Sequence, residues 1–224
     1  MSGGHMTKKP WHGTLITPEI YGRYLAYLLA GDKAACRKVI LALLEKKMDV
    51  KELYSCLLQE SMYEVGEKWE KKEITTATEH LATSITENLI TMIYMRVTPK
   101  RPCRNEIVVA CCQNELHSLG ARIISDFFEL HGWKSYFLGA NVPEKDLLTF
   151  IMHFACPVVG LSFTTAENAD NFLRTVDSIS QKIKTVKVIA GGQGLKMISD
   201  KISFLSERKV SLLFTLDEAE KFII

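Results

Sequence analysis

The feature that most constrains the fold is a change in the spacing of apolar residues near residue 100. Before it, apolar residues recur with the period of an amphipathic helix; after it, short β-branched runs alternate with amphipathic stretches. The segment Thr98-Pro99-Lys100-Arg101-Pro102, with two prolines and two cations, separates the two patterns. We therefore expect two domains, at residues 16–98 and 103–224, preceded by a tag remnant and N-terminal extension at residues 1–15.

The first domain shows four amphipathic helices joined by short loops. Thr17-Pro18-Glu19 has the capping hydroxyl, proline and early acid of a helix start. Asp32 and Asp49 can cap the second and third helices, and a fourth runs from about Thr75 to Val97. Four such helices predict a four-helix bundle.

The second domain alternates five strand candidates with five helical stretches, which predicts a flavodoxin-like, doubly wound five-stranded parallel sheet of strand order 2-1-3-4-5. The strand candidates are Ile107–Cys112, Lys134–Leu138, Val158–Phe163, Val186–Ala190 and Val210–Phe214. The helical stretches are Ser118–His131, Pro143–Phe154, Glu167–Ile183, Leu195–Asp200 and Asp217–Phe222.

Charge and cysteine usage narrow the class of protein. With a formal net charge of only +2, the chain lacks the basic field of a nucleic-acid-binding domain. No apolar run reaches the length of a membrane span and no signal peptide opens the chain. The six cysteines show no CxxC spacing, so we expect reduced, buried thiols in a cytoplasmic protein.

Three loops of the predicted sheet carry unusual residues. They follow strands 1, 3 and 4, which flank the switch point of a 2-1-3-4-5 sheet, where ligands bind. They read Glu115-Leu116-His117-Ser118-Leu119-Gly120, Ser162-Phe163-Thr164-Thr165 and Gly191-Gly192-Gln193-Gly194. Histidine offers a nitrogen base or metal ligand, hydroxyls donate hydrogen bonds, and glycine allows close approach. Alone, the histidine could simply cap the next helix, and the glycines could form a tight turn or suit a phosphate.

Taken together, these loops resemble the cobalamin-binding domain of methionine synthase, corrinoid methyl-carrier proteins and cobalamin-dependent regulators, with its pattern DxHxxG, SxL and GG. The resemblance implies that His117 is the lower axial cobalt ligand and that Gly120 admits the nucleotide tail. The first acid of the motif is Glu115 rather than aspartate. A carboxylate at this spacing can orient the imidazole and raise its basicity.

The other two motifs match with one departure. Ser162 corresponds to the serine of the tail pocket, and Gly191-Gly192 to the paired glycines. Thr164 stands where the SxL pattern has leucine, which changes the contacts expected in that pocket.

The bundle carries a further match. Trp69 is separated by nine residues from Glu79-His80, a spacing that resembles the signature of the light-sensing cobalamin regulators. That resemblance implies that Trp69 covers the adenosyl group, that Glu79 hydrogen-bonds it and that His80 is a candidate upper ligand after photolysis. Without the resemblance, Trp69 and His80 would be ordinary residues of a bundle. The stripe Met62, Tyr63, Met92, Tyr94 and Met95 is expected to serve packing. A MerR-type helix-turn-helix is not seen in this chain.

The resemblance favours a cobalamin-binding photoreceptor or sensory module, in which light-driven cleavage of the Co–C bond of adenosylcobalamin alters domain contacts and partner or self association. The alternatives are a corrinoid methyl carrier for a separate methyltransferase, with methylcobalamin, and an interaction domain that retains the fold without the cofactor. A sensor or carrier is favoured over an enzyme. Some stand-alone relatives also bind a bilin, which leaves a second chromophore open. A homo-oligomer and an unidentified downstream protein are the expected partners, with no nucleic acid and no membrane.

Overall fold

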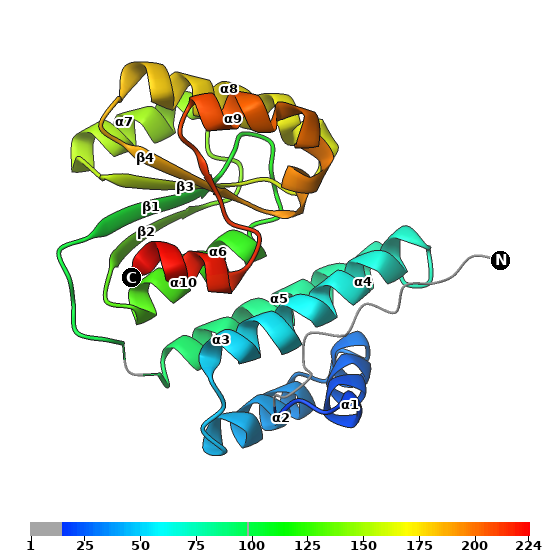
Figure 1. Ribbon diagram of the computed structural model, residues 1–224. Helices are drawn as coiled ribbons and strands as arrows, with labels where there is room; N and C mark the ends of the chain where they lie inside the picture. The colour runs from blue at the N-terminus through cyan, green and yellow to red at the C-terminus, as the bar shows by residue number, and fades with distance from the viewer. Residues whose placement is uncertain (1–14, 98) are drawn as a thin grey trace. The chain divides into compact units, whose positions relative to one another are not determined.

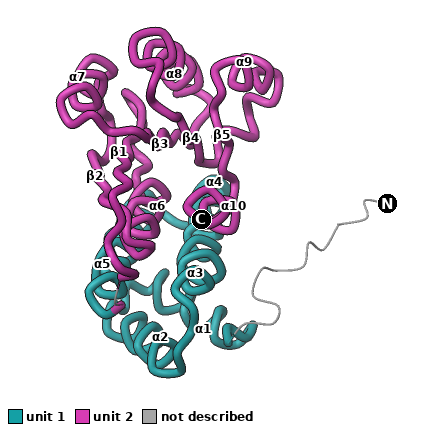
Figure 2. Tube along the Cα trace, turned by 60° about the vertical axis from the view of Figure 1, so that its left-hand side comes forward, with its two compact units in different colours: residues 1–96 teal, residues 97–224 magenta. Residues whose placement is uncertain are grey.

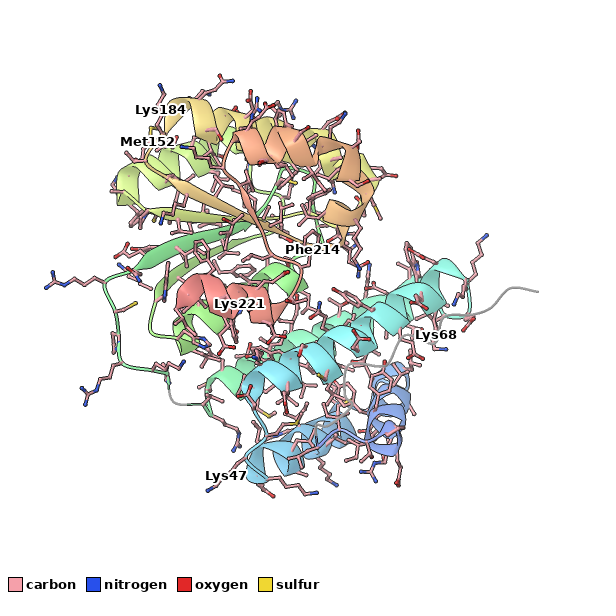
Figure 3. All side chains as sticks on the ribbon, in the orientation of Figure 1. Lys47, Lys68, Met152, Lys184, Phe214 and Lys221 are labelled. Atoms are coloured by element: carbon pink, nitrogen blue, oxygen red, sulfur yellow. The ribbon has the colours of Figure 1, made fainter. Side chains whose placement is uncertain are left out.

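The computed structural model describes residues 15–97 and 99–224. The chain forms two compact units, Met1–Arg96 and Val97–Ile224 (Figure 2). We treat each unit by itself as the bundle unit and the sheet unit. Charged side chains such as Lys47 and Lys184 cover their outer surfaces (Figure 3).

The bundle unit contains the expected helices. Their bounds are α1 (Pro18–Leu29), α2 (Lys33–Glu45), α3 (Val50–Glu52), the π-helix η1 (Leu53–Gln59), α4 (Glu60–Glu70) and α5 (Thr76–Tyr94). The capping side chains of Thr17, Asp32, Asp49 and Thr75 each accept a hydrogen bond from a backbone N–H in the first turn. Because α3, η1 and α4 are continuous, they act as one long helix, and the four-helix arrangement is confirmed.

The π-helix within the third helix is a feature that apolar spacing did not predict. Its seven residues bury five side chains, a wider apolar face than a 3.6-residue period presents. The wider π turn lets residues such as Leu53, Tyr54, Leu57 and Leu58 all face the core.

The sheet unit has five parallel strands in the order β2-β1-β3-β4-β5, as expected. They are β1 (Glu106–Cys111), β2 (Lys134–Gly139), β3 (Val158–Ser162), β4 (Lys187–Gly191) and β5 (Ser211–Leu212). The helices α7 (Glu144–Phe154), α8 (Ala169–Lys182) and α9 (Ile202–Glu207) cover one face. The helices α6 (Leu119–Leu130) and α10 (Leu216–Ile223) cover the other (Figure 1).

Cys111 and Cys112 lie in the two different apolar clusters of the sheet unit, as adjacent residues at a strand end should. All six cysteines are free thiols, but Cys103 is exposed, so the expectation that every thiol is buried was wrong at that position. Cys103 precedes β1 in a segment without helix or strand.

The end of the chain differs most from the expected elements. The stretch expected as a helix at residues 195–200 is a kinked 3-10 segment, η3 (Gln193–Lys201), followed by α9, which was not predicted. A further 3-10 turn, η2 (Ala166–Asn168), precedes α8. Within the described ranges, no helix is both long and apolar enough to cross a lipid bilayer.

Candidate functional site

The three unusual loops of the sheet unit start at the same level of the sheet. Cys111 pairs in register with Ser162, and Ser162 pairs with Gly191, so the carboxyl ends of β1, β3 and β4 are aligned. The loops that follow therefore share one edge of the sheet, which we call the rim. The rim predicted from strand order is present, and ligands of such sheets bind at this edge.

Glu115 is the central residue of the rim. Its side chain is fully buried, whereas the ring of His117 is 59% exposed. One carboxylate oxygen, Oε1, accepts a hydrogen bond from the backbone N–H of His117 at 2.8 Å. The same oxygen lies 2.6 Å from Nδ1 of the His117 ring. Two contacts from one oxygen fix both the backbone and the ring of His117, and they favour the tautomer that carries its proton on Nδ1.

The second carboxylate oxygen of Glu115 holds the loop after β3. Oε2 accepts hydrogen bonds from the backbone N–H of Thr164 at 2.7 Å and from the side-chain amide of Asn168 at 3.0 Å. A longer contact of 3.4 Å comes from the backbone N–H of Thr165. Glu115 therefore ties the loop that carries His117 to the loop that carries Thr164.

These contacts also set the protonation state of Glu115. Burial raises the pKa of the carboxyl, but hydrogen bonds from His117, Thr164 and Asn168 outweigh burial and lower the pKa to about 2. The carboxylate is therefore ionised at neutral pH and can polarise the His117 imidazole, which makes the ring a better metal ligand.

A third loop, after β2, braces the backbone that precedes His117. The side-chain oxygen of Asn141 accepts a hydrogen bond from the backbone N–H of Asn114 at 2.8 Å. The backbone N–H of Asn141 donates to the carbonyl of Glu115, also at 2.8 Å. Asn114 and Asn141 both have positive φ, at 70° and 51°, a conformation that asparagine tolerates better than most residues.

Different constraints act at the glycine positions of the rim. At Gly192, with φ of +103°, an added Cβ would lie 2.1 Å from the carbonyl oxygen of Phe163. At Gly194 it would collide with the ring of Phe163, so these two glycines serve close packing within the chain. At Gly120 an added Cβ meets no protein atom within 4 Å. Packing does not require glycine there, which leaves room for a ligand beside His117.

At Ser162 and Gly191, the other two positions of the motifs, the contacts of the structure involve backbone atoms. The carbonyl oxygen of the buried Ser162 accepts a hydrogen bond from the N–H of Cys112 at 3.3 Å. An added Cβ at Gly191 would lie 3.3 Å from the carbonyl oxygen of Leu213, a tight but not prohibitive contact.

The metal-binding side chains at the rim suit a metal whose other ligands come from a cofactor rather than from the protein. In the described part of the chain, no group of three or more His, Cys, Asp or Glu side chains could hold a bare metal ion. Burial, with the nearby charge of Glu115, raises the pKa of Cys111 and of Cys112 to about 12, so neither thiol offers a thiolate. One oriented imidazole fits cobalt whose equatorial positions are filled by a macrocycle.

The candidate residues of the bundle unit gather where α4 ends and α5 begins. Trp69 is 45% exposed, and its indole N–H donates to the hydroxyl of Thr76 at 3.1 Å. Glu79 accepts a hydrogen bond from the hydroxyl of Thr83 at 2.9 Å. The His80 side chain is 74% exposed and lies 3.6 Å from Glu79. The turn between α4 and α5 thus brings the three residues to one end of the bundle.

The sequence did not identify Asn168 or Asn141 as parts of the rim. Asn168 lies 53 positions from Glu115, and no local pattern connects the two. The signal that could have found it is its place just after the Ser162-Phe163-Thr164-Thr165 segment, on the turn that enters α8.

Comparison with known proteins gives the family. Two family models, each described as a B12 binding domain, match residues 105–203 and residues 20–94. Among curated proteins, the HTH-type transcriptional repressors CarA and CarH of Myxococcus xanthus are similar. CarA is 24% identical over 55% of this chain and 42% of its own length. CarH is 28% identical over 58% of this chain and 43% of its own length, so the chain spans less than half of either relative.

Among solved structures, the monomethylamine corrinoid protein of Methanosarcina barkeri shares the fold with a TM-score of 0.73. The match covers 91% of this chain and 96% of that one at 17% identity. The chain therefore has a helical cap domain, the bundle unit, followed by a flavodoxin-like domain, the sheet unit. With its two model matches covering most of both units, the chain belongs to the B12-binding domain family.

Proposed function

We propose that the rim binds the lower side of a cobalamin, with His117 as the axial cobalt ligand. The observation that carries this proposal is the contact between the buried Glu115 carboxylate and Nδ1 of the exposed His117 ring. This contact holds the ring through Nδ1, which supports Nε2 as the atom that would bind cobalt. The open space at Gly120 supports entry of the nucleotide tail at the same edge.

We further propose that the chain is a photoreceptor or sensory module for adenosylcobalamin. When bound, this cofactor supplies a light-sensitive Co–C bond. Trp69, Glu79 and His80 are proposed to face its upper side, where the indole excludes water and Glu79 accepts a hydrogen bond from the adenosyl group. The spacing of these residues supports the proposal, together with similarity to two transcriptional repressors.

A corrinoid methyl carrier is the second candidate. The observation that favours it is the fold match to the monomethylamine corrinoid protein, which extends over both units of this chain. A carrier would hold methylcobalamin through the same His117 and would present it to a separate methyltransferase. Glu115 in place of the usual aspartate favours the sensor over the carrier.

Cobalamin binding is tested by loading the full chain with adenosylcobalamin in the dark, desalting it and recording its absorption spectrum. We expect the wild-type chain to retain the cofactor with imidazole coordination. The H117A variant should lose that coordination and retain the cofactor at least tenfold less well. H153A removes an exposed histidine of α7 and is the matched control. Equal retention and equal spectra of H117A and wild type would contradict the proposal.

The two functions separate under green light. A sensor should change its spectrum and its molar mass, measured by light scattering, after illumination of the adenosylcobalamin complex. A carrier should keep its mass and should transfer a methyl group from bound methylcobalamin to a thiol acceptor when a corrinoid methyltransferase is added. An illuminated complex with unchanged spectrum and mass would refute photosensing while leaving cobalamin binding intact.

A further inference from the structure

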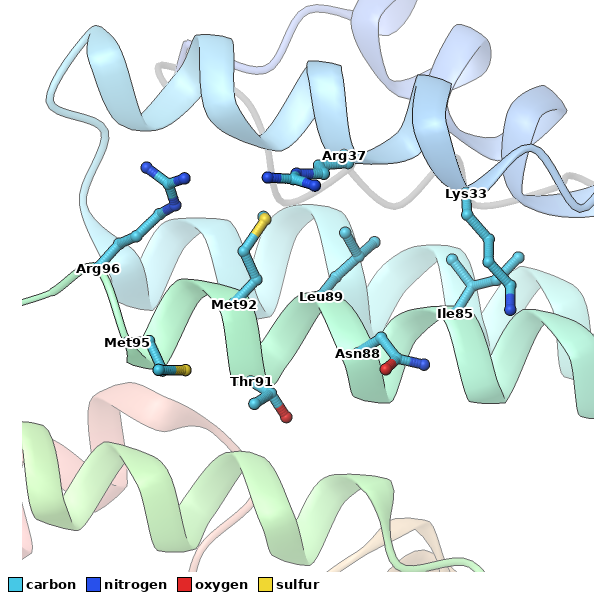
Figure 4. Close-up of a pocket in the computed structure, with 9 residues that line it drawn as sticks. All are labelled: Lys33, Arg37, Ile85, Asn88, Leu89, Thr91, Met92, Met95 and Arg96. Carbon is cyan, nitrogen blue, oxygen red and sulfur yellow. The ribbon is translucent and has the colours of Figure 1, made fainter.

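A groove between α2 and α5 of the bundle unit contains none of the residues proposed to bind cobalamin. It has a volume of about 600 Å³, within the usual range for small-molecule sites. All its lining residues belong to the bundle unit (Figure 4). It does not include Trp69, Glu79 or His80.

The floor of the groove is apolar. Ile85, Leu89 and Met92 recur on α5 at spacings of four and three residues, so they form one stripe. Met95, at the end of the same helix, also lines the groove and is 80% exposed. The expectation that this methionine serves packing was therefore wrong. Unbranched methionine side chains adapt to varied apolar ligands, and exposing one costs free energy unless something covers it.

The edges of the groove carry cationic side chains. Lys33 and Arg37 come from α2 and Arg96 from the end of α5, and no acidic residue lines the groove. Figure 4 shows the guanidinium groups of Arg37 and Arg96 extending toward each other above the apolar stripe. In residues 15–97 and 99–224, none of these three side chains makes an ion pair or a hydrogen bond. By contrast, Arg122 and Arg208 of the sheet unit each bind an aspartate.

Helix electrostatics do not account for this placement. A cation is favourable at the C-terminus of a helix, which suits Arg96 after α5. Lys33 lies in the first turn of α2, where a cation is unfavourable, and Arg37 lies one turn further on, where the helix dipole has little effect. Two unneutralised guanidinium groups that face each other over an apolar stripe have the charge pattern of a site for an anion with an apolar body.

We propose that this groove binds a small anionic amphiphile, with its carboxylate or phosphate between Arg37 and Arg96 and its apolar body along Ile85, Leu89 and Met92. The stretch of α5 from Ile85 to Met95 is about 15 Å long at 1.5 Å per residue. That length suits an extended alkyl chain such as dodecanoate. The proposal does not depend on cobalamin, because no candidate cobalamin residue lines the groove.

Binding is tested with dodecanoate, below its micelle concentration, by titration calorimetry on the full chain without cobalamin. We expect saturable binding to one site. The double variant R37Q/R96Q should bind at least tenfold more weakly. R23Q/K38Q removes the same charge from exposed positions of α1 and α2 outside the groove, and it should bind as wild type does. Circular dichroism of each variant checks that the bundle remains folded.

Two further probes separate charge from apolar contact. Dodecyltrimethylammonium, which has the same tail and a cationic head, should not bind, and butyrate, which has the head without the tail, should bind much more weakly. M92W fills the groove while all three cations remain, and it should abolish dodecanoate binding. Equal binding of the cationic amphiphile, or equal affinity of R37Q/R96Q and wild type, would overturn the proposal. The proposal would also be overturned if the chain formed a dimer that R37Q/R96Q dissociates and if the wild-type chain did not bind dodecanoate. That result would assign the groove to contact between two copies of the chain.

Discussion

The rim of the sheet unit and the end of the bundle unit carry the two halves of the proposed cobalamin site, and they are built in opposite ways. At the rim, the fully buried Glu115 binds His117, Thr164 and Asn168. At the bundle end, Trp69 and His80 are exposed, and their side chains make one hydrogen bond and one contact of 3.6 Å. Contacts within the protein therefore fix His117, the proposed lower ligand, whereas fewer contacts hold Trp69 and His80.

The largest difference should appear when the two glutamates are removed. E115A leaves the N–H groups of Thr164 and His117 and the amide of Asn168 without their acceptor, which should cost about 4 kcal/mol of unfolding free energy. E79A removes a partly exposed side chain from a helix and should change stability by less than about 0.5 kcal/mol. Urea denaturation of the apoprotein measures both. Equal losses would show that the rim is no more preorganised than the bundle end.

Glycine replacements compare the backbones of the two regions. G192A places a methyl group against the Phe163 carbonyl at a positive φ, and the forced backbone shift should cost about 3 kcal/mol. G22A lies in α1, where an added Cβ meets nothing within 4 Å, and it should stabilise the bundle by about 0.5 to 1 kcal/mol. Thermal unfolding of both variants is the measurement. A neutral G192A would mean that the rim can relax around the added methyl.

Acid should weaken the rim selectively. The pKa of Glu115 falls from 4.5 to about 2 in the folded chain, so its stabilisation is present above pH 4.5 and is lost as pH falls toward 2. Relative to E115Q, the wild-type apoprotein should lose about 2 kcal/mol between pH 5 and pH 3. E79A, which removes the carboxylate at the bundle end, serves as the comparison variant in the same titration. Parallel profiles of E115Q and wild type would contradict the ionised, hydrogen-bonded carboxylate.

The same contrast explains what the sequence could predict. Strand order and the position of His117 follow from local apolar patterns and the rules of parallel sheets, and both expectations about the fold were confirmed. The contact of Glu115 with Asn168 joins residues 53 positions apart, and only the packed loops bring them together. The π-helix and the exposure of Met95 depend on how helices pack, which periodicity does not encode.

The smallest effect on stability, and the most specific test of the bundle end, comes from T76V. This change removes the acceptor of the Trp69 indole N–H, an exposed hydrogen bond, and should alter the unfolding free energy by less than about 0.5 kcal/mol. If Trp69 faces the upper side of the cofactor, the released indole should reduce the preference of the chain for adenosylcobalamin over hydroxocobalamin several-fold, measured by competitive binding. T91V is the control, because the exposed Thr91 hydroxyl donates to the Glu87 carbonyl of its own helix. If T76V, like T91V, left this cofactor preference unchanged, Trp69 would not contact the upper ligand. The preorganised part of the cofactor site would then lie entirely at the rim.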